Sequence, residues 1–134
     1  MTNYLLDTNH LSPLVTPGHS LRAKVFEHVQ LGDQFAIAAP AFNEFLFGIG
    51  VALRSIQNWR EWELIRDDFV YYDLNVVFAE EAAKLRIILR KQGRQLEAID
   101  SMLAVTALGN NLTLLTTDKD FFAVPNLKQE NWLT

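Results

Sequence analysis

Four acidic residues stand at positions where a charged side chain is unusual: Asp7, Glu44, Asp100 and Asp118. Asp7 directly follows a short apolar run, and Glu44 is the only charged residue between positions 33 and 54. Asp100 and Asp118 enclose a long stretch without any charge. Burying an unpaired carboxylate costs on the order of several kcal/mol, so such residues normally have a cation or hydrogen-bond donors as partners.

Each acid taken singly also has an ordinary structural interpretation. Asp7 is suited to cap the next helix, and Asp118 is suited to a turn in the run Thr-Thr-Asp-Lys-Asp. Asp100 is favoured by the positive end of a helix dipole. Glu44 is expected to be buried in an apolar helix, where an ion pair with an arginine would compensate it.

The hydrophobic pattern shows which elements must position these acids. Apolar runs of strand length occupy residues 3–6, 35–38, 71–74 and 112–115, and a short last strand is expected near Leu127. Apolar residues recur at helical spacing in the segments 21–29, 40–53, 59–69, 78–89 and 99–108. Strands that alternate with helices are typical of a parallel sheet covered on both faces. We therefore expect an α/β fold, with residues 1–134 as one domain because no repeat or linker divides them.

The expected fold brings the acids to one edge of the sheet. Asp7 follows the first strand and Asp118 follows the strand at 112–115, and ligands of such sheets gather at the carboxyl ends of the strands. Carboxylates gathered there would repel one another unless a cation lay among them. Oxygen ligands without cysteine or a suitable histidine pair select Mg²⁺ or Mn²⁺ over zinc. Such an ion binds phosphate oxygens and lowers the pKa of a bound water.

Composition narrows the class of protein. The chain has 134 residues, 49% of them apolar and none of them cysteine, which excludes a disulfide scaffold and a cysteine-type zinc site. The N-terminus has no signal-peptide pattern, and the most membrane-like stretch, residues 35–53, contains Pro40, Asn43 and Glu44. We expect a cytoplasmic protein without membrane association. The formal net charge of −4 argues weakly against nucleic-acid binding, although a divalent ion would offset part of it.

The ordered motifs resemble one family over essentially the whole chain. Leu5-Leu6-Asp7-Thr8-Asn9 resembles the opening motif of PIN-domain nucleases, in particular the VapC-like toxins of bacterial and archaeal toxin–antitoxin modules. The similarity continues through Phe42-Asn43-Glu44, Leu85-Arg86 up to Gly93, Ile99-Asp100, residues 115–121, residues 124–127 and Asn131-Trp132.

This resemblance implies a three-layer α/β/α sandwich and metal-dependent cleavage of RNA phosphodiesters. It assigns Asp7, Glu44, Asp100 and Asp118 to the catalytic, metal-binding site. Asp7 and Asp100 are the first choices as direct metal ligands, whereas Glu44 is expected to bind metal or to orient the attacking water. Asp120 competes with Asp118 for the fourth position.

The resemblance also suggests supporting groups and partners. Asn9 and Thr116 or Thr117 are expected to hold the carboxylates in place. A homodimer and an antitoxin that lays a segment over the active site are implied as well. The charge pattern itself, apart from the resemblance, favours a solvated helix face for each basic residue taken singly. As a group, the basic residues in the middle of the chain are the best candidates for phosphate contacts: Arg54, Arg60, Arg66, Lys84, Arg86, Arg90, Lys91 and Arg94. The histidines, His10, His19 and His28, are expected at the surface or at helix caps.

Other classes of protein remain open from the sequence. A receiver-type Mg²⁺-binding signalling module usually has two adjacent acids after its first strand, and only Asp7 is present here. A PIN-like scaffold without catalytic activity is disfavoured because it would retain four costly acids without benefit. A nuclease that acts on DNA differs only in substrate, and no residue pattern in this sequence distinguishes it.

Overall fold

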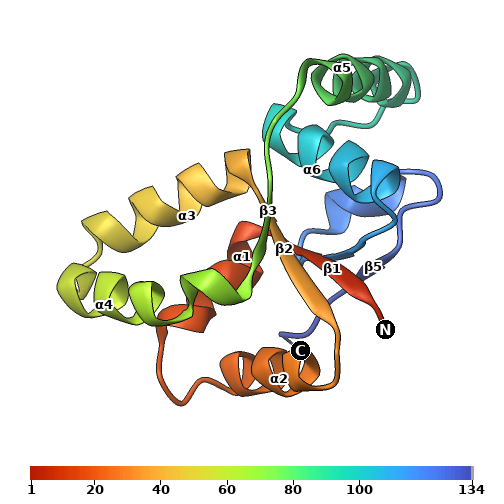
Figure 1. The fold of residues 1–134 in the computed structure, drawn as a ribbon. Coiled ribbons are helices and arrows are strands. Elements are labelled where there is room, and N and C mark those ends of the chain that lie inside the picture. The colour runs from red at the N-terminus through yellow and green to blue at the C-terminus, as the bar shows by residue number, and fades with distance from the viewer. Residues whose placement is uncertain (134) are drawn as a thin grey trace.

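The computed structural model describes residues 1–133, and a five-stranded parallel sheet lies at its centre (Figure 1). The strands are β1 (Asn3–Leu6), β2 (Gln34–Ala38), β3 (Val70–Tyr72), β4 (Thr113–Leu115) and β5 (Gln129–Glu130). Their order in the sheet is β3-β2-β1-β4-β5, and every neighbouring pair is parallel. The chain therefore builds outward from β1 in one direction and later returns to β1 on its other side. The boundary between β1 and β4 is the switch point of the sheet.

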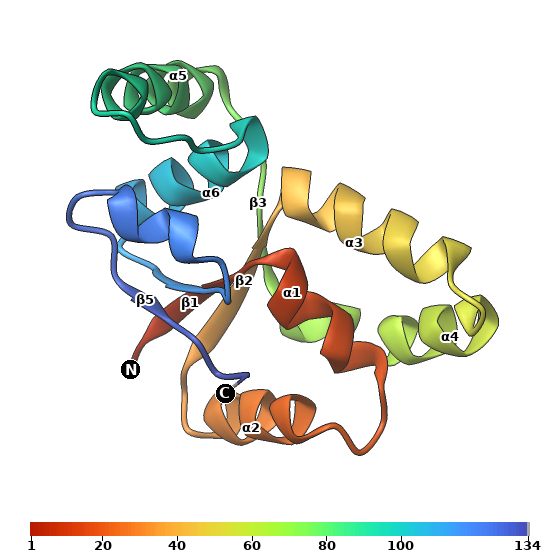
Figure 2. The same cartoon turned by 180° about the vertical axis from the view of Figure 1, so that it is seen from behind.

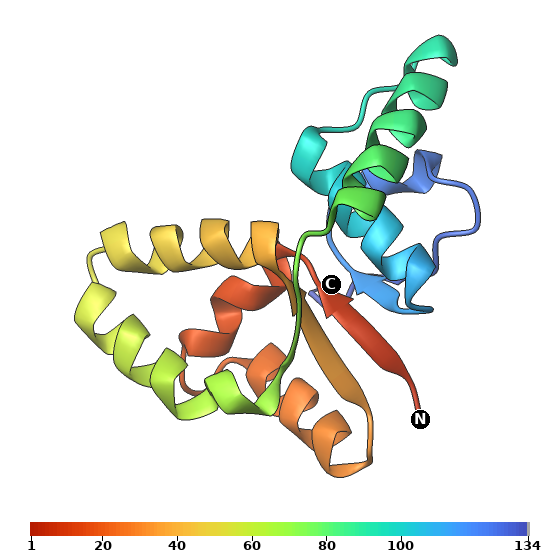
Figure 3. The ribbon, with the colours of Figure 1, turned by 45° about the horizontal axis from the view of Figure 1, so that its top comes forward.

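Helices cover both faces of this sheet, as expected. The α-helices are α1 (Thr8–Leu11), α2 (Ser20–Gln30), α3 (Ala39–Val51), α4 (Ser55–Ile65), α5 (Val76–Lys91) and α6 (Ala98–Gly109). Helices α1 to α4 lie on one side of the sheet, and α5 and α6 lie on the other (Figure 3). Short 3-10 helices occupy η1 (Ser12–Val15), η2 (Arg66–Asp68) and η3 (Lys119–Ala123). This arrangement confirms the predicted α/β/α sandwich.

The central strands are apolar without alternation because helices bury both of their faces. Leu5 and Leu6 of β1, Phe35 and Ile37 of β2 and Leu114 of β4 are all fully buried. Leu6 pairs with residue 115 in the register of β1 and β4, so the next residue of each strand emerges at the same carboxyl edge. Viewed from behind, α1 leaves the end of β1 at this edge (Figure 2).

An aromatic cluster fixes α4 against α3 and the segment that leads into β3. The indole of Trp62 is fully buried and stacks on Phe69 with ring centroids 5.7 Å apart. It also packs edge-to-face with Phe45, with ring centroids 5.0 Å apart, and at a tilt against Phe42 at 5.8 Å. The predicted helix over 59–69 thus differs in its bounds: α4 begins at residue 55 and ends at 65, and η2 carries the apolar stripe on to Phe69.

Helix α3 differs from its predicted environment. Its inner side packs through Ala41, Phe45 and Ile49, but Phe47 and Val51 are largely exposed on its outer side. Apolar residues therefore lie on all sides of α3, but only its inner side is buried. Among residues 1–133, no helix combines the length and the apolar character that crossing a membrane requires.

Candidate active site at the switch point of the sheet

Asp7 and Thr116 lie side by side where β1 and β4 end. The main-chain N–H of Asp7 donates to the carbonyl of Leu115 at 3.0 Å, which continues the strand pairing by one step. One carboxylate oxygen of Asp7, Oδ1, accepts from the Thr8 main-chain N–H at 2.8 Å and so caps α1. The other, Oδ2, accepts from Thr116 Oγ1 at 2.7 Å and from Asn9 Nδ2 at 3.2 Å. The buried carboxylate of Asp7 therefore caps α1 and also contacts Thr116 and Asn9 at the candidate site.

The buried hydroxyl of Thr116 joins the two strand-end acids. It accepts from the main-chain N–H of Asp118 at 3.0 Å, which leaves its single proton for Asp7. Asp118 is half-buried, and its Oδ1 accepts from the main-chain N–H of Asp120 at 2.9 Å, capping η3. Asp120 itself is exposed, and its side chain has no hydrogen bond within residues 1–133. Asp118 is thus the acid that the fold ties to Asp7.

The two threonines at the end of β4 have different roles. Successive side chains of a strand point to opposite faces, so Thr116 points into the site and Thr117 is exposed. Thr117 contributes through its main-chain N–H, which donates to Asn9 Oδ1 at 3.2 Å. Of the three predicted supporting residues, Asn9 and Thr116 contact Asp7 directly, and Thr117 acts through Asn9.

Helices supply the other two acids. Asp100 lies in the first turn of α6 and is half-buried. Glu44, on α3, accepts from Thr8 Oγ1 at 3.2 Å through its Oε2. The expected burial of Glu44 is wrong, and the alternative of an ion pair with an arginine is absent: the residue is exposed, and within residues 1–133 it forms no ion pair. Exposure makes compensation by an arginine unnecessary.

Neighbouring acids raise the proton affinity of Asp100. Burial and the negative charges of Asp7, Asp118, Glu44 and Glu97 raise the pKa of Asp100 to about 7. Burial also raises the pKa of Asp7, and the donors Thr116, Thr8 and Asn9 oppose that effect. The carboxyl of Asp100 therefore lies within the electrostatic influence of the other three predicted acids. A proton on Asp100 or a cation between the acids relieves their repulsion.

A divalent cation fits this region by the chemistry of the donors. The side chains offer only carboxylate, hydroxyl and amide oxygens, which are the ligands of Mg²⁺ and Mn²⁺. As the side chains are placed in residues 1–133, no three acidic or histidine groups converge closely enough to enclose an ion. Asp7 and Asp118 instead accept hydrogen bonds from the protein. Glu44, Asp100 and Asp118 are exposed or half-buried, so their carboxylates have the freedom to turn toward a shared ion.

Sequence reasoning missed His10. The residue is fully buried, contrary to the expectation of a surface or capping histidine, and its two ring nitrogens lie within hydrogen-bond distance of Asn9 and Trp132. Burial lowers the pKa of His10 to about 4. His19 is a helix cap as predicted, because its Nδ1 accepts from the Leu21 N–H at the start of α2. Nothing in the spacing of the sequence separates these two histidines.

This chain is similar to known proteins both in its sequence family and in its fold. The PIN domain family matches residues 4–127. A structure of VapBC2 from Rickettsia felis bound to a promoter DNA fragment superposes with a TM-score of 0.84 and 23% identity, covering 98% of this chain and 99% of that chain. DNA-bound VapBC from Salmonella typhimurium gives 0.82 and 20% identity over 98% and 99% of the two chains.

A more distant structure has the same fold. VapC20 from Mycobacterium tuberculosis, a sarcin–ricin loop cleaving toxin, superposes with a TM-score of 0.65 and 11% identity over 91% of this chain and 95% of that chain. No curated protein sequence matches the chain significantly. Because the family match extends over nearly all of the chain and agrees with the parallel sheet and its order of elements, this protein belongs to the PIN-domain family.

Proposed function

We propose that this protein is a metal-dependent endoribonuclease and the toxin of a toxin–antitoxin pair, with residues 1–134 acting as one nuclease domain. The observation that carries the proposal is the electrostatic coupling of Asp7, Glu44, Asp100 and Asp118 at the switch point of the sheet. An acid whose pKa is raised by neighbouring acids in a ligand-binding position, as Asp100 is, is typical of a catalytic site. Membership of the PIN-domain family supports a nuclease in particular.

Asp7 and Asp100 are the proposed direct ligands of Mg²⁺ or Mn²⁺, with Asp118 and Glu44 completing the acidic set. When bound, the metal supplies positive charge for the scissile phosphate and lowers the pKa of a water. The chain's own groups prepare this site. Thr116, Asn9 and the Thr8 N–H hold both oxygens of Asp7, and Thr8 Oγ1 holds Glu44 toward the same edge. Glu44 is exposed enough to orient or deprotonate a water at the phosphate.

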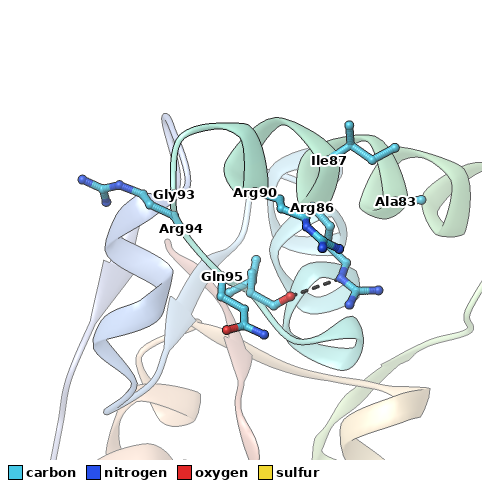
Figure 4. Close-up of a pocket in the computed structure, with 8 residues that line it drawn as sticks. Ala83, Arg86, Ile87, Arg90, Gly93, Arg94 and Gln95 are labelled. Carbon is cyan, nitrogen blue, oxygen red and sulfur yellow. Dashed lines mark hydrogen bonds between the residues drawn. The ribbon is translucent and has the colours of Figure 1, made fainter.

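A basic cavity gives the RNA backbone a place to bind. Arg86, Arg90 and Arg94 line a cavity of about 640 Å³ between the end of α5 and the segment that leads into α6. Arg86 Nε donates to the Leu96 carbonyl at 3.1 Å, and the guanidinium groups of Arg86 and Arg90 extend to the same side, whereas Arg94 points away (Figure 4). Within residues 1–133, none of these arginines has a carboxylate partner. Their charge is therefore free for phosphates, despite the net charge of −4.

The Arg90→Gln variant is expected to bind RNA more weakly and with less dependence on salt. The side chain of Arg90 forms no hydrogen bond or ion pair within the described residues, so its loss removes charge without disturbing the fold. We expect affinity to fall about 3- to 10-fold and the log–log salt slope to decrease by about 0.7 to 1. Fluorescence anisotropy of a labelled RNA measures the affinity and its salt slope. Both proteins also carry Asp100→Asn, so that the RNA is not expected to be cut. Lys128→Gln, at an exposed lysine just before β5 that is not among the expected phosphate contacts, is the control, and an equal effect there would contradict the assignment.

Metal affinity is expected to fall as the pH drops below about 7. The raised pKa of Asp100 means that its carboxyl carries a proton in a growing share of molecules below that pH, and a metal must displace this proton. We expect Mn²⁺ binding to weaken by up to roughly tenfold per pH unit below 7 and to change little above pH 7.5. Calorimetric titration at constant ionic strength measures the profile. An affinity that stays constant from pH 5.5 to 8 would contradict the role of Asp100.

The proposed partners are an antitoxin protein and a second copy of this chain in the cytoplasm. Support for an antitoxin comes from the VapBC assemblies whose fold this chain shares. Exposed apolar side chains on α3 and near the start of α4, namely Phe47, Val51, Leu53 and Ile56, offer surface that a protein partner would bury. Co-expression with the protein encoded beside it, followed by size-exclusion chromatography, tests this part of the proposal.

Incubation of the purified protein with RNA tests the catalytic part. Total cellular RNA and a single-stranded DNA pool are each incubated with Mg²⁺, with Mn²⁺ and with a chelator. The proposal predicts discrete RNA fragments that require metal, with the DNA pool left intact. Cleavage of DNA alone would replace the proposed substrate. No cleavage by folded, metal-loaded protein in RNA from its own host would support the inert scaffold instead.

A further inference from the structure

A chain of hydrogen bonds connects the C-terminal segment to the carboxylate of Asp7. The main-chain N–H of Trp132 donates to His10 Nε2 at 3.0 Å. His10 Nδ1 lies 2.6 Å from Asn9 Oδ1, and Asn9 Nδ2 donates to Asp7 Oδ2 at 3.2 Å. Asp7 and Trp132 are far apart in sequence, so these contacts link the end of β1 to the segment after β5.

The main-chain N–H of Trp132, at one end of this series of hydrogen bonds, determines which group donates in each of the others. The main-chain N–H of Trp132 can only donate, so His10 Nε2 must accept and Nδ1 must carry the proton of the neutral ring. That proton goes to Asn9 Oδ1, which also receives the Thr117 N–H. With two donors on its oxygen, the amide of Asn9 has its NH₂ group toward Asp7. A flipped amide would place its oxygen against the carboxylate and lose both donors.

Burial makes this arrangement rigid. His10 is fully buried, so water does not readily replace a broken contact at either ring nitrogen. Burial also favours the uncharged ring, in which Nε2 remains an acceptor, and lowers the pKa of His10. The neutral tautomer that orients Asn9 is thus the form that the fold itself stabilises.

Contacts with its ring fix the position of Trp132. Its ring lies 4.9 Å from Tyr4, 4.7 Å from His28 and 5.8 Å from Phe35, measured between centroids. Lys24 Nζ lies over the same ring at 4.1 Å from its centre. Strands β1 and β2 and helix α2 therefore hold the residue whose N–H orients His10.

We propose that His10 is a positioning residue, which fixes the carboxylate of Asp7 through the amide of Asn9 and is itself anchored by the main chain of Trp132. The inference rests on the proposed function of Asp7 as a metal ligand. It adds His10 and the segment around Trp132 to the acids and to the groups that donate directly to them. Its consequence is that His10 affects metal binding and turnover, and leaves RNA binding unchanged.

Two substitutions separate the two ring nitrogens. The side-chain amide of His10→Asn places an N–H near the former Nδ1, so it keeps the donor to Asn9 and loses the contact with Trp132. The longer His10→Gln reaches the former Nε2, so its oxygen accepts from Trp132 while the donor to Asn9 is lost. Both variants replace a buried ring by a smaller polar group, which makes them matched in their general cost to packing.

Mn²⁺ affinity and kinetics are the first readouts. Loss of a group that orients a metal ligand typically costs about 10- to 100-fold in affinity, and His10 acts one bond further away. We expect His10→Gln to weaken Mn²⁺ binding about 5- to 20-fold and to lower kcat by a similar factor, with KM for RNA within about twofold of wild type. His10→Asn is expected to stay within about threefold of wild type in Mn²⁺ affinity.

A readout without metal keeps this test separate from the test of the proposed function. In metal-free protein, the Asn9 side-chain amide resonances are expected to shift in His10→Gln and to stay near their wild-type positions in His10→Asn. Unchanged resonances in His10→Gln overturn the proposal, whether or not the wild type binds Mn²⁺ or cuts RNA. Equal Mn²⁺ affinity in both folded variants overturns it as well. An affinity that does not depend on the N–H donated to Asn9 would reflect the packing of residue 10 alone.

Discussion

Asp7→Asn and Asp100→Asn are each expected to reduce metal-dependent RNA cleavage by at least about 100-fold. Loss of a group that merely orients a metal ligand already costs about 10- to 100-fold, so loss of a ligand's charge should cost more. Asp7 is buried with both oxygens hydrogen-bonded, and Asp100 carries the strongest electrostatic coupling to the other acids. Initial cleavage rates at saturating Mg²⁺ or Mn²⁺, with a defined RNA fragment, measure the effect.

The chain offers a control for each of these variants. Asp120→Asn changes an exposed acid two residues from Asp118 and should keep activity within about threefold, because that charge is not coupled to Asp100. Asp100→Asn should unfold no more easily than wild type in the absence of metal, since it removes a charge that the neighbouring acids disfavour. Equal activity of wild type and Asp100→Asn would exclude Asp100 from the site. Loss in Asp120→Asn alone would move the fourth acid to that position.

Trp62→Ala is expected to lower the free energy of unfolding by about 3 to 5 kcal/mol. The indole is fully buried and contacts Phe42, Phe45 and Phe69, so its removal leaves a large cavity between α3, α4 and the sheet. Such a loss is a large share of the total stability of a domain of this size. Urea unfolding followed by far-ultraviolet circular dichroism measures it without depending on tryptophan fluorescence.

Trp62→Phe is the matched control for this prediction. The buried indole N–H of Trp62 has no hydrogen-bond partner within the described residues, and phenylalanine removes that group while keeping an aromatic ring. Its cost is expected to stay below that of the alanine variant, by about 1 to 3 kcal/mol. A loss under about 1 kcal/mol for Trp62→Ala would show that the cluster does not determine the stability of the fold.

Much of the fold was predictable because burial in a parallel sheet leaves a direct trace in the sequence. The runs that form β1, β2 and β4 are apolar on both faces, and two of them end where a polar residue appears: Asp7 after β1 and Thr116 after β4. Position after a strand was enough to predict that Asp7 and Asp118 lie at the same edge of the sheet. Helix α1 was not predicted because four residues are too few to show a helical period.

Other features depend on the register and packing of side chains. The choice between Thr116 and Thr117 required the register of β4, which turns one hydroxyl inward and the other outward. Glu44 looked buried because apolar residues surround it in sequence, yet the outer side of α3 is exposed. His10 owes its role to a contact with Trp132, and a contact between distant segments leaves no local pattern.

Crystals soaked in Mn²⁺ would test the central claim most directly, because anomalous scattering locates the ion without any assumption about catalysis. We expect a strong peak at the carboxyl ends of β1 and β4, within roughly 2.0–2.3 Å of carboxylate oxygens of Asp7 and Asp100. The same soak of an Asp100→Asn crystal should weaken or abolish that peak. No peak at this edge at saturating Mn²⁺, or a peak only among other residues, would contradict the account.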